Sequence, residues 1–128
     1  MTYVDTSVLL AQVLAEDVQP PAELWTEELV SSRLAEYELW VRLHAYGKAA
    51  SHAVAATEAL ARLDLVELHP AACARCLAPF PSSVRTLDAL HLATADYLRS
   101  RGATTLRVAT YDAQMRRAAT AMGLGLRF

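Results

Sequence analysis

The sequence contains few of the residues that mark fibrous, low-complexity or disulfide-linked chains. Its 128 residues include four glycines, five prolines and two cysteines. So little glycine and proline excludes collagen-like and low-complexity chains, and two cysteines are too few for the framework of a small secreted domain. Hydrophobic residues make up 54% of the chain and charged residues 20%, which is typical of a globular protein. We therefore expect one domain over residues 1–128.

The sequence also lacks an excess of positive charge and a long apolar run. The formal net charge is −2, which excludes a basic protein that coats nucleic acid by charge alone. No apolar stretch approaches the roughly 20 residues of a membrane-spanning helix. Near the start, Asp5 interrupts the segment where a secretory signal would need a basic region and a clean apolar run. We expect a cytoplasmic protein with no membrane partner.

Short apolar segments alternate with helical patterns along the whole chain. Strands are expected at residues 2–4, 29–32, 65–68, 105–109 and 124–128. Helices are expected at residues 6–15, 22–28, 33–46, 51–63, 70–77, 86–101 and 113–122. This alternation favours an α/β fold in which a parallel sheet is covered by helices on both faces.

Acidic residues recur where such a fold would bring them together. Asp5 directly follows the first expected strand, and Asp112 comes shortly after the fourth. Ligands of open parallel sheets bind at the carboxyl ends of the strands. Asp88 lies in the first turn of helix 86–101, and Glu36 and Glu38 lie in the first turns of helix 33–46. Carboxylates gathered at one edge raise each other's pKa unless a cation joins them.

The cation that suits such a set of acids is Mg²⁺, or Mn²⁺ in its place, because both prefer oxygen ligands. A site of this kind activates water and binds a phosphodiester.

Each acid also has a structural alternative: Asp5 and Asp112 can be helix N-caps, and Asp88 can be a first-turn acid. Asp88, however, lies between Leu87 and Ala89 in an apolar stretch, where a charge needs a partner or the rim of a cleft.

Only one of the two glutamates can face this edge, because positions two apart on a helix point about 200° apart. Glu38 shares a stripe with Val41 and Ala45, which indicates that this face turns inward. Glu36 shares its face with Leu43, so periodicity alone leaves both glutamates open.

Four segments resemble the motifs of PIN domains. Residues 3–7 (YVDTS) resemble the first motif, 32–39 (SRLAEYEL) the second, 87–95 (LDALHLATA) the third and 110–112 (TYD) the fourth. Their order and spacing fit over nearly the whole chain, and the most similar subgroup is the VapC-like toxins of bacterial type II toxin–antitoxin systems. The resemblance implies a PIN-like three-layer α/β/α sandwich with a short-stranded central parallel sheet. It also implies a Mg²⁺-dependent endoribonuclease.

Carried over by motif position, the resemblance implies four catalytic and metal-binding acids. These are Asp5, Glu38, Asp88 and Asp112, so the family spacing favours Glu38 over Glu36. The hydroxyl groups that would neighbour the site and orient its carboxylates belong to Thr6, Ser7 and Thr110.

The resemblance also implies partners. The substrate would be RNA, and a small VapB-like antitoxin would neutralise the activity. Apolar aromatic residues on helices of the first half, which are Trp25, Tyr37 and Trp40, lead us to expect a homodimer as well.

Two other classes of protein remain as alternatives. A receiver-like phosphoacceptor domain also gathers acids at strand ends, but it would need a lysine after the last strand, and the only lysine is Lys48, in a helical region. The second alternative is a catalytically silent PIN-like interaction module, against which the presence of all four acids argues.

Two further motifs have structural interpretations. Cys73 and Cys76 form a single C-x-x-C pair, whereas a structural zinc site needs four ligands; we favour ordinary packing. His91 lies three residues after Asp88, on roughly the same helical face. A hydrogen-bonded structural histidine is the preferred interpretation there.

Overall fold

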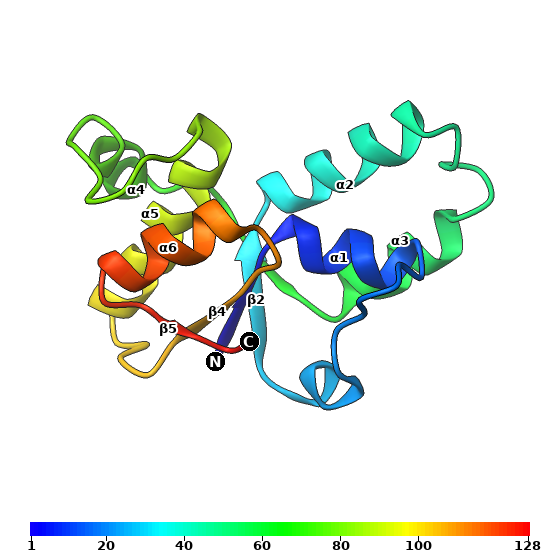
Figure 1. Cartoon of the computed structure of the whole chain (residues 1–128), viewed down its shortest axis with the longest axis horizontal. Coiled ribbons are helices and arrows are strands. Elements are labelled where there is room, and N and C mark those ends of the chain that lie inside the picture. The colour runs from blue at the N-terminus through cyan, green and yellow to red at the C-terminus, as the bar shows by residue number, and fades with distance from the viewer.

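Five short parallel strands form the centre of the protein, whose computed structural model describes residues 1–128 (Figure 1). The strands are β1 (Thr2–Val4), β2 (Leu29–Ser32), β3 (Asp64–Val66), β4 (Arg107–Ala109) and β5 (Gly125–Leu126). They lie in the order β3-β2-β1-β4-β5, and every neighbouring pair is parallel. The chain thus builds the sheet outward from β1 to β3, then returns to the other side of β1 for β4 and β5.

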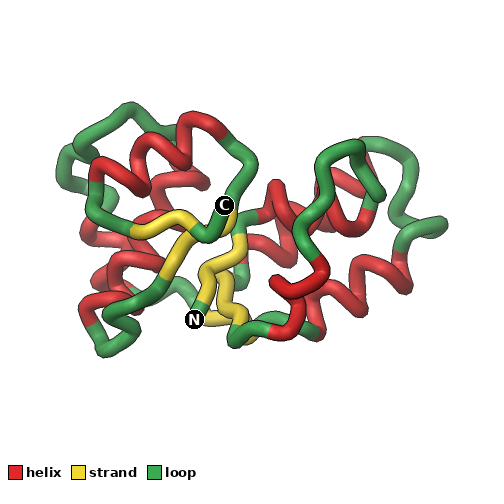
Figure 2. The backbone as a smooth tube through the Cα atoms, turned by 60° about the horizontal axis from the view of Figure 1, so that its bottom comes forward, coloured by secondary structure: helices red, strands yellow, loops and turns green.

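Helices cover both faces of this sheet, as Figures 1 and 2 show. One layer consists of α1 (Thr6–Val13), α2 (Leu34–Ala45) and α3 (Ala53–Ala61), and the other of α4 (Pro70–Arg75), α5 (Thr86–Ser100) and α6 (Ala113–Ala121). The prediction of an α/β/α sandwich with a short-stranded parallel sheet is confirmed. None of the helices combines the length and the apolarity needed to cross a membrane.

The alternation of side chains along each strand divides the core into two clusters. Tyr3 and Val108 pack in the cluster beneath α5 and α6. Their neighbours Val4 and Ala109 belong to the cluster beneath α1, α2 and α3. Successive residues of a strand point to opposite faces, so even a three-residue strand contributes to both layers.

Several of the expected elements are shorter than predicted, among them the second helix and the last strand. The segment expected to be a helix at 22–28 is a 3-10 helix, η1 (Ala22–Thr26), and the expected strand at 124–128 is only Gly125–Leu126. The 3-10 helix ends early because the next two residues join the sheet region: the carbonyl of Glu28 accepts a hydrogen bond from the Thr2 amide at 2.9 Å, and the Glu27 side chain accepts one from the Thr2 hydroxyl.

Candidate active site

The candidate site lies where the order of the strands reverses. The connections from β1 and β4 lead to opposite layers, through α1 and α6 (Figure 1). The two strands are nonetheless hydrogen-bonded neighbours, and the Asp5 amide donates to the carbonyl of Ala109 at 3.0 Å. Asp5 and Thr110 therefore leave the sheet side by side, at the switch point where ligands of open α/β sheets bind.

Asp5 is held by one of its two carboxylate oxygens. Oδ2 accepts hydrogen bonds from the Ser7 amide at 3.3 Å, the Ser7 hydroxyl at 2.7 Å and the Thr110 hydroxyl at 2.8 Å. The side chain is buried, and it caps the N-terminus of α1. No protein group donates to Oδ1, so the cap leaves one oxygen of Asp5 free for a ligand.

Asp112 is arranged in the same way at the start of α6. Its Oδ1 accepts a hydrogen bond from the Met115 amide at 2.7 Å, which makes it the N-cap. Its backbone amide donates to the Thr110 hydroxyl oxygen at 3.1 Å. Thr110 therefore joins the two aspartates, and Oδ2 of Asp112 has no protein donor.

Glu38 reaches the same region from α2. Its Oε1 accepts hydrogen bonds from the Thr6 hydroxyl, at 3.1 Å, and from Nε2 of His91, while Oε2 has no protein donor. Glu36 lies elsewhere, in an ion pair with Arg33 at 3.5 Å. The structure thus brings Glu38, and not Glu36, to the other acids.

The inference that the Glu38 face of α2 turns inward, drawn from its apolar neighbours, is nevertheless wrong. Val41 is 66% exposed and Ala45 is also exposed, whereas the buried residues of α2 are Ala35, Leu39 and Leu43. Glu38 is partly buried and lies about 100° around the helix from Leu39, on the flank of α2 between its buried and exposed faces.

Asp88 differs from the other three acids because no protein group donates a hydrogen bond to it. It is half-buried in the first turn of α5. Burial raises its pKa to about 6, and the negative charges of Asp5, Asp112 and Glu38 add to the increase, while His91 opposes it. Asp88 therefore lies in the negative field of the other three carboxylates.

The donor set suits a hydrated divalent cation better than a dehydrated one. No three acidic, cysteine or histidine side chains converge closely enough to enclose a metal ion by themselves. Mg²⁺ does not require such an enclosure, since it keeps several waters and binds directly through one or two carboxylates. The free oxygens of Asp5, Glu38 and Asp112, beside the unpartnered Asp88, fit that mode of binding.

The hydrogen-bonded chain behind Glu38 includes one group that the sequence analysis did not single out. Tyr3 Oη lies 2.7 Å from Nδ1 of His91, and the Ser32 amide donates to Tyr3 Oη at 3.1 Å. His91 is fully buried, as expected for a structural histidine. The signal for Tyr3 was its position two residues before Asp5, which places both side chains on the same side of the chain.

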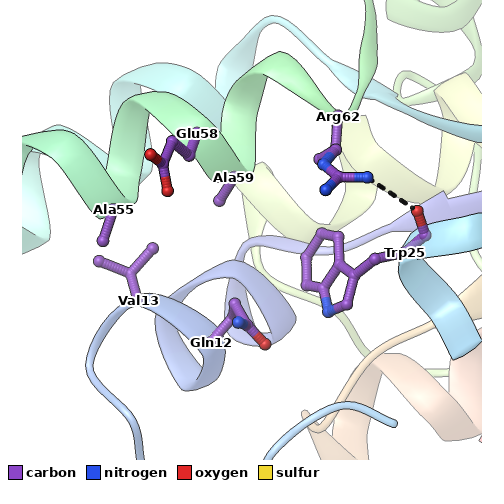
Figure 3. Close-up of a pocket in the computed structure, with 7 residues that line it drawn as sticks. All are labelled: Gln12, Val13, Trp25, Ala55, Glu58, Ala59 and Arg62. Atoms are coloured by element: carbon purple, nitrogen blue, oxygen red, sulfur yellow. Dashed lines mark hydrogen bonds between the residues drawn. The ribbon is translucent and has the colours of Figure 1, made fainter. Parts of the chain in front are cut away.

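Other hollows and motifs lie apart from these acids. A cavity of 240 Å³ is lined by residues of α1, η1 and α3, among them Val13 and Trp25, by Arg62 directly after α3, and by none of the acids described above (Figure 3). Cys73 and Cys76 are free thiols on and beside α4.

Comparisons with known proteins identify the family. The PIN domain profile matches residues 2–121. Ribonuclease VapC46 of Mycobacterium tuberculosis is 39% identical over 97 residues, which cover 76% of this chain and 71% of the relative. Ribonuclease VapC35 of the same organism is 33% identical over 132 residues, with coverages of 98% and 95%. A solved toxin-antitoxin complex from Klebsiella pneumoniae shares the fold, with a TM-score of 0.67, 17% identity and 94% coverage of both chains. The chain therefore belongs to the PIN domain family and is similar to its VapC members.

Proposed function

We propose that this protein is an endoribonuclease that hydrolyses RNA phosphodiester bonds at the acidic edge of its sheet, as the toxin of a type II toxin–antitoxin system. Its full-length relative VapC35 and its relative VapC46 are both named ribonucleases. Mg²⁺ is the proposed cofactor, with Mn²⁺ as a substitute, and the proposed metal-binding and catalytic residues are Asp5, Glu38, Asp88 and Asp112.

The observation that carries the proposal is that protein donors bond to only one oxygen in each of three acids, and to neither oxygen of the fourth. Asp5, Glu38 and Asp112 are each oriented through a single oxygen. The carboxylate of Asp88 has no hydrogen bond, and its pKa is raised first by burial and then by the surrounding negative charges. Four neighbouring carboxylates repel one another, and a cation that they share best explains why the protein brings them together.

Each residue then has a defined task. A bound Mg²⁺ would supply a Lewis acid that activates water and offsets the charge of the scissile phosphate. Asp5 and Asp88 would be the direct ligands, and Asp112 and Glu38 would act directly or through water. The hydroxyls of Ser7 and Thr110 hold Asp5 in one orientation, as Thr6 does for Glu38.

The proposal includes an antitoxin protein and a second copy of this chain as partners. The support for the antitoxin is the similarity to VapC proteins and to a chain of a toxin-antitoxin complex. For protein contacts in general, the support is apolar surface on the outside of α2, where Tyr37, Val41 and Tyr46 are 58%, 66% and 51% exposed. A homodimer predicts a mass of two chains by light scattering at micromolar concentration; a monomer at every concentration would contradict it.

The test is RNA cleavage by the purified protein with Mg²⁺, with a chelator, and with Mg²⁺ restored after the chelator. We expect cleavage only when the metal is present, with internal cuts in the RNA. The matched control is Asp96→Asn, which replaces an aspartate of the same helix that pairs with Arg99 instead of facing the site. Equal cleavage with and without chelator would contradict the proposal, and acyl-phosphate labelling of an aspartate would favour a phosphoacceptor domain.

A further inference from the structure

We infer that His91 is a positioning residue that fixes the carboxylate of Glu38, so that one glutamate oxygen stays directed at the cation site. The inference rests on the proposed function, because it assigns His91 a task at that same site. It adds a residue outside the four acids, and with it a hydrogen-bonded chain that runs from β1 through α5 to α2.

The chain of contacts begins in the sheet. The Ser32 amide at the end of β2 donates to Tyr3 Oη at 3.1 Å, and Tyr3 Oη lies 2.7 Å from His91 Nδ1. On the other side of the imidazole ring, Nε2 contacts Oε1 of Glu38. Both His91 and Tyr3 have 0% exposure, so water does not compete for these bonds.

The proton positions follow from these partners. The Tyr3 oxygen accepts from an amide, so the Tyr3 hydroxyl proton is free to be donated to Nδ1. An imidazole that accepts at Nδ1 carries its own proton on Nε2, which is the nitrogen that faces Glu38.

The consequence for Glu38 is a carboxylate with one oxygen occupied and one free. His91 and Thr6 both donate to Oε1, from α5 and α1 respectively. These two fixed donors prevent rotation of the carboxylate, and Oε2 is left without a protein donor. The Glu38 side chain is 21% exposed, and the bonds from His91 and Thr6 are the only hydrogen bonds that the protein makes to its carboxylate.

The substitutions that isolate this role are His91→Gln and His91→Asn. A glutamine amide nitrogen takes approximately the position of Nε2 and can still donate to Glu38, whereas the shorter asparagine can reach only Tyr3. Glu38→Gln and the double variant His91→Asn/Glu38→Gln complete a double-mutant cycle. His44→Asn is the matched control, since His44 is exposed at the far end of α2.

The primary measurement is the affinity of the metal-free proteins for Mn²⁺ alone, without RNA, from the free-ion electron paramagnetic resonance signal. We expect His91→Asn to weaken binding about 10-fold to 100-fold, as loss of a group that orients a metal ligand does. Glu38→Gln should weaken it at least as much, and the double variant should be no weaker than Glu38→Gln. His91→Gln should restore most of the affinity, and His44→Asn should bind as the wild type does.

Three results would overturn the inference: wild-type affinity in folded His91→Asn, equal losses in His91→Gln and His91→Asn, or losses that multiply in the double variant. A wild-type protein that binds no Mn²⁺, or a Glu38→Gln variant that binds it normally, would instead contradict the proposed function and the inference with it.

Nitrogen-15 NMR of histidine-labelled wild-type protein gives a test that needs neither metal nor a folded variant at position 91. We expect one buried histidine whose Nε2 carries a proton. A buried ring protonated only on Nδ1 would overturn the inference.

Discussion

Acidic residues at the two ends of the parallel sheet differ in their charged neighbours and in the direction in which their pKa is shifted. At the amino end, Glu27 accepts hydrogen bonds from Thr2 at 2.6 Å and from Arg127 at 2.7 Å, and Arg107 lies 3.8 Å away. The hydrogen bond from Thr2, together with the two arginines, outweighs burial and holds the pKa of Glu27 below its usual value. At the carboxyl end, Asp5, Asp88 and Asp112 form no ion pair, and the pKa of Asp88 rises to about 6.

We interpret this difference as a difference in role: Glu27 stabilises the fold, whereas the three aspartates are positioned to bind a ligand. Glu27 connects the starts of β1 and β4 to the C-terminal segment, and its charge lies beside the opposite charges of Arg107 and Arg127. At the carboxyl end the three aspartates have no ion pair, and their mutual repulsion costs stability, as functional sites often do. The predictions below test this contrast, from the largest expected effect to the smallest.

Asp88→Asn should have the largest effect, because it removes the one acid without a protein partner while preserving its shape. We expect RNA cleavage to fall about 100-fold or more, as it does when an electrostatic group of a reaction centre is lost. The fold should remain intact by circular dichroism. Cleavage at the wild-type rate under limiting Mg²⁺ would remove Asp88 from the site.

Glu38→Gln and Glu36→Gln compare two glutamates of the same helix that have different partners. Glu38 joins the site through Thr6 and His91, whereas Glu36 pairs with Arg33. We expect Glu38→Gln to lose about 10-fold or more in cleavage or to require much more Mg²⁺, and Glu36→Gln to behave as the wild type. The reverse pattern would assign the role to Glu36, and no effect from either would leave three aspartates.

Glu27→Gln tests the other end of the sheet. Loss of the charge weakens two hydrogen bonds and the contacts to both arginines, so the free energy of unfolding at pH 7 should fall by about 1 kcal/mol. Because the pKa of Glu27 is lowered in the folded state, this stabilisation should disappear as the pH falls through that pKa. Glu28→Gln, an exposed neighbour with no ion pair, is the matched control. A loss of cleavage without a loss of stability would contradict the contrast.

The pH dependence of stability gives the opposite sign for Asp88. Its pKa is about 6 when folded and about 3.9 in an unfolded chain, so the folded state binds the proton more tightly. In the presence of chelator, the stabilising contribution of protonated Asp88 is therefore lost as the pH rises from about 4 to about 6. In urea unfolding, the free energy of unfolding of Asp88→Asn should rise relative to that of the wild type by on the order of 1 kcal/mol across that pH range. A constant difference between the two proteins would contradict the pKa.

Much of the fold could be predicted from the sequence, because its signals are local. The apolar run before Asp5, the long segment from Thr86 and the strand before Thr110 each mark an element by their residue pattern, and the ends of these elements lie within two residues of the predicted ones. The local pattern of residues 22–28 predicts an α-helix instead of the 3-10 helix, because the early end of η1 depends on Glu27 and Glu28 bonding to β1, a contact that no local pattern reveals.

The geometry of the candidate site was less predictable, because it depends on contacts between distant elements. That Asp5 and Asp112 share an edge follows from parallel strands, but their link through Thr110 depends on β1 and β4 being neighbours. The apolar stripe beside Glu38 faces solvent, since helix periodicity shows that a face is apolar without showing what covers it. Tyr3 and His91 are 88 residues apart, and only their crossing in space reveals the chain of hydrogen bonds behind Glu38.

The most direct test of the central claim is to locate Mn²⁺ in crystals of the wild-type protein by anomalous diffraction. The account predicts an anomalous peak at the carboxyl end of the sheet, in contact with an oxygen of Asp5 or Asp88 and bound by Glu38 and Asp112 directly or through water. The same crystals of Asp88→Asn should show a weaker peak or none. An empty acidic edge in the wild-type protein at saturating Mn²⁺, or binding only at another place such as Cys73 and Cys76, would contradict it.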